Sequence, residues 1–172
     1  SLLLLVMQYS RKHYLNFWDG QLQTAVASKV IKWNWYNATT TYTTAWYAGM
    51  NTWNTYGNSV GGVSIATSTT ATSSADLLVL DIASSSSDFF LGTYTPLVGP
   101  DQLKFNPYFM NQFDNSVKQY TVTHELGHAL GLGHSYLGNI MLSYATSTGQ
   151  TALGTQDISD YDYLNTLSPT LW

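Results

Sequence analysis

The sequence contains no cysteine in its 172 residues. This absence excludes a disulfide scaffold, a thiol nucleophile and any metal site that uses cysteine ligands. Charge is also scarce, because Asp, Glu, Lys and Arg make up 9% of the chain, against about 25% in a typical soluble domain. Only 6 residues are Lys or Arg and the net charge is -4. We therefore expect no nucleic-acid partner, since binding phosphates requires clustered basic residues.

Long apolar runs are missing as well, and none approaches the roughly 18 residues of a membrane span. The chain is nevertheless 44% hydrophobic and 15% aromatic, which is enough to build a packed core. Its polar surface must be largely uncharged, with 18 Ser, 22 Thr and 11 Asn. This surface composition is typical of extracellular proteins, so we expect a secreted protein. The length predicts one domain over residues 1–172, and we expect a monomer.

The first residues do not form a standard secretory signal. The apolar run Leu2–Met7 precedes the basic residues Arg11 and Lys12, whereas a signal peptide has its basic residues before the apolar stretch. Residues 1–15 are therefore interpreted as an N-terminal arm on the body of the protein, a first strand, or a remnant of a longer precursor. His13, among basic neighbours, is interpreted as a surface histidine.

The periodicity of apolar residues predicts a mixed set of strands and helices. Strands are expected over 30–36, 60–66, 77–82 and 91–97, with one more at 103–105 inside an irregular segment, 101–113. Helices are expected over 41–54, 115–130 and 157–167, with a turn marked by Gly57-Asn58 and Gly61-Gly62. Trp33, Trp35, Trp46 and Trp53 fall at strand and helix spacing, so we expect them in the core. The order of elements predicts an α+β fold with a small mixed, twisted sheet.

Three of the four histidines fall in one segment, His124-Glu125-Leu126-Gly127-His128-Ala129-Leu130-Gly131-Leu132-Gly133-His134. His124 and His128 are four residues apart in a predicted helix, so both rings leave the same face. That spacing lets two imidazoles bind one metal ion at about 2.0–2.1 Å. Gly131 lets the chain turn back, so that His134 approaches as a third ligand. The fourth position stays open for water, as a catalytic zinc ion requires.

Glu125 is the predicted catalytic residue. It lies about 100° around the helix from His124, too far to be an easy ligand but close enough to contact a metal-bound water. It would accept the proton of this water and pass it to the leaving amine. A HExxH pattern alone is often an ordinary surface helix, whereas the eleven-residue spacing is a strong indication of a zinc site.

The segment HELGHALGLGH resembles the zinc signature of the metzincin metallopeptidases. Ser135 after the third histidine, together with Asn139-Ile140-Met141, resembles the matrixin branch, in a small bacterial or archaeal form. The resemblance implies a zinc endopeptidase with an active-site helix, a backing helix and a C-terminal helix, which binds a protein or peptide substrate as an extended strand. It implies that Met141 forms a packed floor beneath the site, and that residues 144–156 form the wall of a substrate pocket.

Other family features carry over less directly. Residues 92–95 are expected to be an edge strand; a peptide adds to such a strand through backbone hydrogen bonds. No histidine lies between His13 and His124, so a second, structural zinc site is not expected. Tyr144 lies three residues after Met141, one more than the tyrosine that assists catalysis in some relatives. Calcium binding, frequent in the family, would use oxygens from among Asp76, Asp81, Asp88, Asp101 and Asp114.

Two other functions remain open at this point. One is a wall-associated binding domain built on an inactive peptidase fold, although the presence of Glu125 argues against the loss of activity. The other is a zinc-dependent hydrolase that acts on a non-peptide amide.

Overall fold

The computed structural model describes residues 25–143 and 149–166. The predicted N-terminal arm, residues 1–15, and His13 lie outside the described residues, as does Tyr144. The described chain forms a mixed α+β fold, as the sequence predicts. Its strands are β1 (Val30–Ile31), β2 (Trp33–Trp35), β3 (Ser64–Ile65), β4 (Leu77–Asp81), β5 (Gly92–Thr95) and β6 (Asp101–Phe105). Its helices are α1 (Thr43–Val60), α2 (Pro107–Met110), α3 (Asn115–Leu130) and α4 (Thr155–Thr166), with a 3-10 turn, η1, at Thr72–Ser74.

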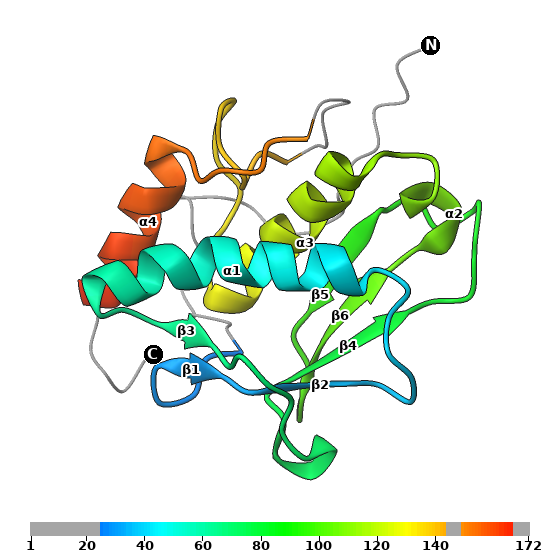
Figure 1. Ribbon diagram of the computed structural model, residues 1–172, viewed down its shortest axis with the longest axis horizontal. Helices are drawn as coiled ribbons and strands as arrows, with labels where there is room; N and C mark the ends of the chain where they lie inside the picture. Colours follow the sequence, from blue (N-terminus) through cyan, green and yellow to red (C-terminus); the bar gives the residue numbers. More distant parts are fainter. Residues whose placement is uncertain (1–24, 144–148, 167–172) are drawn as a thin grey trace.

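The main sheet has four strands in the order β2-β4-β6-β5. β2, β4 and β6 are parallel, whereas β5 runs antiparallel to β6 at one edge, with Gly92 opposite Phe105. The sheet is therefore small and mixed, as expected. In Figure 1, α1 crosses the molecule beside α3, the strands of this sheet lie towards one side of the pair, and α4 lies near the C-terminal end of α1.

The single strand predicted over 30–36 is wrong, because the chain forms two strands there. β1 pairs with β3 in a separate two-stranded sheet, and β2 pairs with β4 in the main sheet. The division falls at Lys32, whose backbone N–H donates to the carboxylate of Asp76 at 2.9 Å instead of to a neighbouring strand. The predicted alternation survives the division, since Ile31 and Trp33 are both fully buried. The strand predicted over 60–66 is shortened to β3.

The predicted turn lies at Gly61-Gly62 and not at Gly57-Asn58. α1 continues through both residues and ends at Gly61, whose φ of 63° gives the left-handed conformation of a helix C-terminus. Gly57 is a packing residue: a Cβ there would collide with the carbonyl oxygen of Val63 and the hydroxyl of Tyr161. Glycine at this position allows two elements to approach closely. From the sequence alone, such a glycine cannot be distinguished from one that marks a turn.

The segment 101–113 is more regular than expected, since it holds the five-residue strand β6 and the short helix α2. Asn106 joins the two: its side chain accepts from the backbone N–H of Tyr108 and begins α2. The predicted active-site helix, 115–130, matches α3. The predicted C-terminal helix, 157–167, matches α4 within two residues at its start.

One hydrophobic core joins the helices α1, α3 and α4 to the sheet. The prediction that the tryptophans lie in the core is confirmed for Trp33, Trp46 and Trp53, which are fully buried. Trp35 is partly buried and packs against this core. Trp33 and Trp46 lie 4.9 Å apart between ring centroids, and Trp53 stacks on Tyr161 of α4 at 6.0 Å. None of the described helices is long and apolar enough to cross a lipid bilayer.

Candidate metal centre

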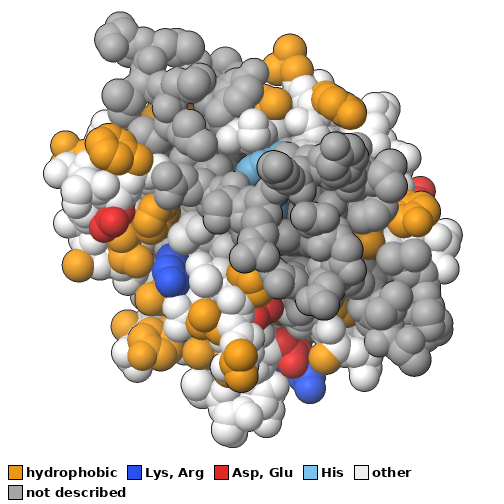
Figure 2. Space-filling view, turned by 180° about the vertical axis from the view of Figure 1, so that it is seen from behind, with side chains coloured by type: hydrophobic (Ala, Val, Ile, Leu, Met, Phe, Trp, Pro, Cys, Tyr) orange, Lys and Arg blue, Asp and Glu red, His pale blue; other side chains and the backbone are white. Residues whose placement is uncertain are grey.

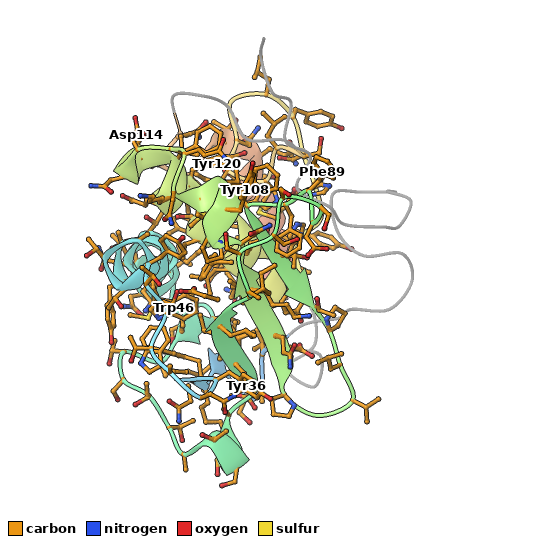
Figure 3. All side chains as sticks on the ribbon, turned by 90° about the vertical axis from the view of Figure 1, so that its right-hand side faces the viewer. Tyr36, Trp46, Phe89, Tyr108, Asp114 and Tyr120 are labelled. Atoms are coloured by element: carbon orange, nitrogen blue, oxygen red, sulfur yellow. The ribbon has the colours of Figure 1, made fainter. Side chains whose placement is uncertain are left out.

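The helix that carries the site is fixed at both ends by local sequence. Asp114 caps its start by accepting from the backbone N–H groups of Ser116 and Val117 at 3.1 and 3.2 Å. The hydroxyl of Ser116 also donates to Asp114, and these bonds lower the pKa of its carboxyl. Figure 3 shows Asp114 at the outer end of the helix and Tyr120 further along it. The cap therefore sets where α3 begins and which face turns inward.

The end of α3 returns the chain towards the histidines. Gly131 has a φ of 103°, and the backbone N–H of Leu132 donates to the carbonyl oxygen of Gly127 at 2.9 Å. A side chain at a positive φ is strained, so glycine at position 131 favours this sharp stop. The chain turns here and places His134 beside the last turn of the helix.

The three predicted ligands meet as expected. Nε2 of His128 lies 3.1 Å from Nε2 of His124 and 3.2 Å from Nε2 of His134. All three side chains are buried, and they form a group whose ligand atoms lie within 4.8 Å of one another. Four-coordinate zinc with Zn–N bonds of about 2.05 Å would hold two nitrogens about 3.3 Å apart. The observed separations therefore suit a single small ion.

The hydrogen bonds of the rings fix which nitrogens face inward. Nδ1 of His124 lies 2.7 Å from the carbonyl oxygen of Ile140, and Nδ1 of His128 lies 2.8 Å from that of Leu132. A carbonyl oxygen only accepts, so Nδ1 carries the proton in both neutral rings and Nε2 presents a lone pair. Two lone pairs facing each other at 3.1 Å repel rather than bond. A cation between them resolves this conflict, and the donor set thus fits a metal ion.

Burial keeps the His124 ring neutral. The loss of hydration lowers the pKa of His124 to about 3, and the neighbouring His134 adds to this effect. A neutral imidazole is the form that binds metal ions, so protons do not compete for this ring at neutral pH.

Glu125, the only glutamate in the sequence, is buried next to the ligands. Burial raises the pKa of its carboxyl to about 8, opposed in part by a backbone hydrogen bond from Tyr94 of β5. The helix and the strand are in close contact here, since a Cβ at Gly92 would lie 3.0 Å from Cγ of Glu125. Glu125 therefore lies between the metal centre and the edge strand.

A carboxylate that the sequence did not reveal supports the site from behind. Asp157, fully buried on α4, accepts from the backbone N–H groups of Ile140 and Gly154 at 2.6 and 2.7 Å and of Met141 at 3.1 Å. In the opposite direction, the side-chain oxygen of Asn139 accepts hydrogen bonds from the backbone N–H groups of Gln156 and Asp157. Because the carbonyl of Ile140 holds His124, this clamp orients a ligand from a distance.

Met141 is buried beneath the ligand helix, as expected of a packed floor. Its sulfur occupies the space where a Cβ would stand at Gly127, so the glycine is required for this contact. The methionine side chain thus reaches the backbone of α3 between His124 and His128.

Four of the five aspartates considered for calcium, Asp76, Asp81, Asp101 and Asp114, accept structural hydrogen bonds through their carboxylates. Asp81 binds Thr40 and Thr41 before α1, and Asp101 accepts from the hydroxyl of Tyr94 at 2.5 Å. Burial raises the pKa of Asp101. Within residues 25–143 and 149–166, at least three His, Cys, Asp or Glu ligand atoms converge only at the three histidines. Calcium binding stays a prediction without a site.

Comparison with known protein families gave no matching family model, and comparison with curated proteins gave no matching relative. The chemistry of the site is therefore argued from its own geometry.

Proposed function

We propose that the protein is a zinc-dependent endopeptidase. The observation that carries this proposal is the buried group of three imidazoles whose Nε2 atoms lie close together, with Glu125 beside it. Three nitrogen ligands and an open fourth position are typical of catalytic zinc, whereas structural zinc sites are closed by a fourth protein ligand.

A bound zinc ion would supply a Lewis acid that acidifies water and polarises a carbonyl group. The role of the protein is then to hold and move a proton. Glu125 accepts the proton of the attacking water at its carboxylate and delivers it to the nitrogen of the leaving amine. The backbone N–H of Tyr94 donates to this carboxylate and orients it.

The edge strand supports a peptide as the substrate. Among the described strands β5 pairs only with β6, and on its other edge the backbone N–H of Tyr94 donates to Glu125. An extended peptide can pair with further backbone groups of this edge as an additional strand. Gly92 and Tyr94 bring β5 against Glu125, so a peptide on this edge passes next to the metal centre. The uncharged, hydroxyl-rich composition further favours a secreted enzyme.

The proposal is tested by metal analysis together with peptide cleavage. We expect one equivalent of zinc per chain and cleavage of unfolded protein or peptides, abolished by a chelator and restored by zinc. Glu125→Ala should retain zinc and lose activity by about 10²–10⁴-fold, the range that a general base supplies. His134→Ala should weaken zinc binding. A zinc-loaded protein that cleaves no member of a peptide library would refute the proposal, and a non-peptide amide hydrolase would then be tested.

A further inference from the structure

A buried carboxylate on β6 lies one strand away from the edge strand that contacts Glu125. Asp101 is only 7% exposed, in a chain in which charged residues make up 9%. In Figure 2, the face that shows pale blue histidine carries Asp, Glu, Lys and Arg only in small, separate patches. Burial raises the pKa of Asp101, opposed in part by the hydrogen bonds that its carboxylate accepts. A carboxylate is retained inside a fold only where such partners hold it, and here the partners show what it contributes.

Both carboxylate oxygens of Asp101 hold the chain at and just after β5. Oδ2 accepts from the hydroxyl of Tyr94 at 2.5 Å, and Oδ1 accepts from the backbone N–H of Leu97 at 2.8 Å. The backbone N–H of Asp101 donates to the carbonyl oxygen of Asp76, directly before β4, at 2.9 Å. Asp101 thus ties the edge strand and the turn that follows it to the interior of the sheet.

The tether between Asp101 and Tyr94 lies on the buried face of the two strands. Gly92 and Tyr94 are the buried residues of β5, and Asp101 is buried on β6. Tyr94 lies opposite Leu103, so Asp101, two residues earlier on β6, is its diagonal neighbour on the same face. Figure 1 shows both strands next to α3, and a Cβ at Gly92 would lie 2.8 Å from Cγ2 of Thr121 on this helix. The tether therefore holds the part of the sheet that packs against the ligand helix.

The backbone of Tyr94 connects this tether to the metal centre. Its N–H donates to the carboxylate of Glu125, while its hydroxyl donates to Asp101. β5 is only four residues long, and among the described strands it pairs only with β6. Any shift of β5 relative to β6 would therefore move the N–H donor away from Glu125. A small misplacement of a reacting group is costly, because catalysis depends on its alignment with the substrate.

We propose that Asp101 is a positioning residue for Glu125: by holding the hydroxyl of Tyr94 and the N–H of Leu97, it keeps the N–H of Tyr94 directed at the glutamate. The inference rests on the proposed peptidase function and adds a residue to the same site. Asp101 acts through β5, so the shape of its hydrogen bonds matters more than its charge. An amide at position 101 can accept from Leu97 through its oxygen and donate to the phenol oxygen through its nitrogen, whereas a methyl group can do neither.

The test removes each end of the tether and compares it with a matched tyrosine elsewhere. Tyr94→Phe deletes the hydroxyl, Asp101→Ala deletes the carboxylate, and Asp101→Asn keeps two hydrogen-bonding groups. Tyr161→Phe is the matched control, because Tyr161 is also fully buried and its hydroxyl donates at 2.5 Å to the carbonyl oxygen of Val63. Values of kcat and KM are measured for each variant on one peptide, together with zinc content and Tm.

We expect Tyr94→Phe and Asp101→Ala to lower kcat by about 10–100-fold, the loss that a small misplacement causes. Asp101→Asn should retain most of the wild-type kcat. Tyr161→Phe should lower Tm about as much as Tyr94→Phe does but leave kcat and KM unchanged, because each variant loses one buried hydrogen bond. All four variants should bind one equivalent of zinc.

Three outcomes would overturn the inference. One is an unchanged kcat in Tyr94→Phe and Asp101→Ala. Another is an equal loss of kcat in the control Tyr161→Phe, which would assign the effect to stability alone. The third is a rise in KM without a fall in kcat, which would mean that the tether serves only to present β5 to the peptide.

A double variant tests whether the tether acts through Glu125. In the Glu125→Ala background, Tyr94→Phe should cause no further loss of the residual activity, since the group that it positions is already absent. A further loss as large as the one seen in the wild-type background would contradict the inference.

Hydrogen exchange separates this inference from the proposed function, because it needs no substrate. The amide proton of residue 94 should exchange about tenfold faster in zinc-loaded Glu125→Ala and Asp101→Ala than in wild type, and at the wild-type rate in Tyr161→Phe. If the protein cleaves no peptide but shows this pattern, the peptidase proposal fails and Asp101 still positions Glu125. If it cleaves peptides but Asp101→Ala leaves the exchange unchanged, the peptidase proposal stands and the role of Asp101 is refuted.

Discussion

The paired helices α1 and α3 bury very different side chains. α1 has no charged residue, and most of its buried side chains are apolar, among them Trp46, Met50 and Trp53. α3 buries two threonines, two histidines and a glutamate within eight residues, listed in order as Thr121, Thr123, His124, Glu125 and His128. Figure 3 shows Trp46 on α1 among side chains of the core below the level of α3. One helix supplies packing, and the other presents polar groups inside the protein.

The difference between the two helices shows that α1 contributes mainly to stability, whereas α3 carries the candidate site. Apolar burial stabilises the fold by roughly 25 cal/mol per Å², whereas a buried polar group is tolerated only when it is paired. On α3 the threonine hydroxyls donate to the carbonyl oxygens one turn earlier, and two histidines pair with loop carbonyls. Trp53 joins the two helices directly, since its indole N–H donates to the carbonyl oxygen of Thr123 at 2.7 Å.

Replacing Trp53, which joins the two helices, should have the largest effect on the free energy of unfolding. Trp53→Ala deletes a fully buried ring that contacts Tyr161 and opens a cavity beside Gly127, so we expect a loss of about 3–5 kcal/mol in the free energy of unfolding. Trp53→Phe keeps much of the packing but leaves a carbonyl without its donor, and should lose about 1–3 kcal/mol. Urea unfolding of the metal-free protein measures both. Equal losses in the two variants would show that packing does not dominate at this position.

A substitution on α3, Glu125→Gln, should have the opposite effect and raise the free energy of unfolding. Burial raises the pKa of Glu125 from 4.5 to about 8, so the charged form is disfavoured in the folded, metal-free protein. The destabilisation is absent below about pH 4.5 and complete above about pH 8. Glu125→Gln carries no charge. At about 1.4 kcal/mol per pKa unit, less about 1–3 kcal/mol for an imperfectly paired amide, the variant should gain roughly 2–4 kcal/mol of stability at pH 9.

Two measurements sharpen this result. The gain should shrink as pH falls and become a loss of about 1–3 kcal/mol below pH 5, where wild-type Glu125 is protonated in the folded protein and only the cost of the amide remains. Trp53→Phe serves as the control because its loss does not depend on the ionisation of a carboxyl group. A gain from Glu125→Gln that is independent of pH would mean that the charge of Glu125 is not the source.

The same contrast explains what could be predicted from sequence. The ligand helix was predictable because two signals agree there: the periodicity of its apolar residues and the glycine at its end, Gly131. His124, His128 and His134 were predictable because metal geometry imposes their spacing. The edge strand β5 was found by its β-branched and aromatic alternation.

What the sequence did not reveal depends on contacts between distant segments. Gly57 lies inside α1 because Tyr161, more than a hundred residues later, occupies the space above it. Asp157 was expected only to lie in a terminal helix, and its three backbone donors come from residues 140–154. A lone aspartate at a helix start has the same local pattern whether it caps its own helix or supports a distant loop. The division of residues 30–36 between two sheets is likewise decided by Asp76.

The clamp at Asp157 gives the smallest of the three expected effects on stability. Asp157→Asn keeps the size of the side chain but replaces one acceptor oxygen with a donor, which faces backbone N–H groups. Burial already raises the pKa of this carboxyl, so removal of the charge relieves part of the penalty. We expect a net loss of about 1–2 kcal/mol. Since the clamp positions the carbonyl that holds His124, metal affinity should also fall by about 10–100-fold.

Asp162→Asn is the matched control, because Asp162 lies on the same helix and accepts only from the exposed hydroxyl of Tyr56 among the described contacts. Both variants are measured by urea unfolding without metal and by competition with a chelator for zinc. If Asp157 only stabilised α4, the two losses in metal affinity would track the two losses in stability. A fall in affinity in Asp157→Asn that exceeds its loss of stability, and is absent in Asp162→Asn, identifies Asp157 as a positioning residue that acts through Ile140 on His124.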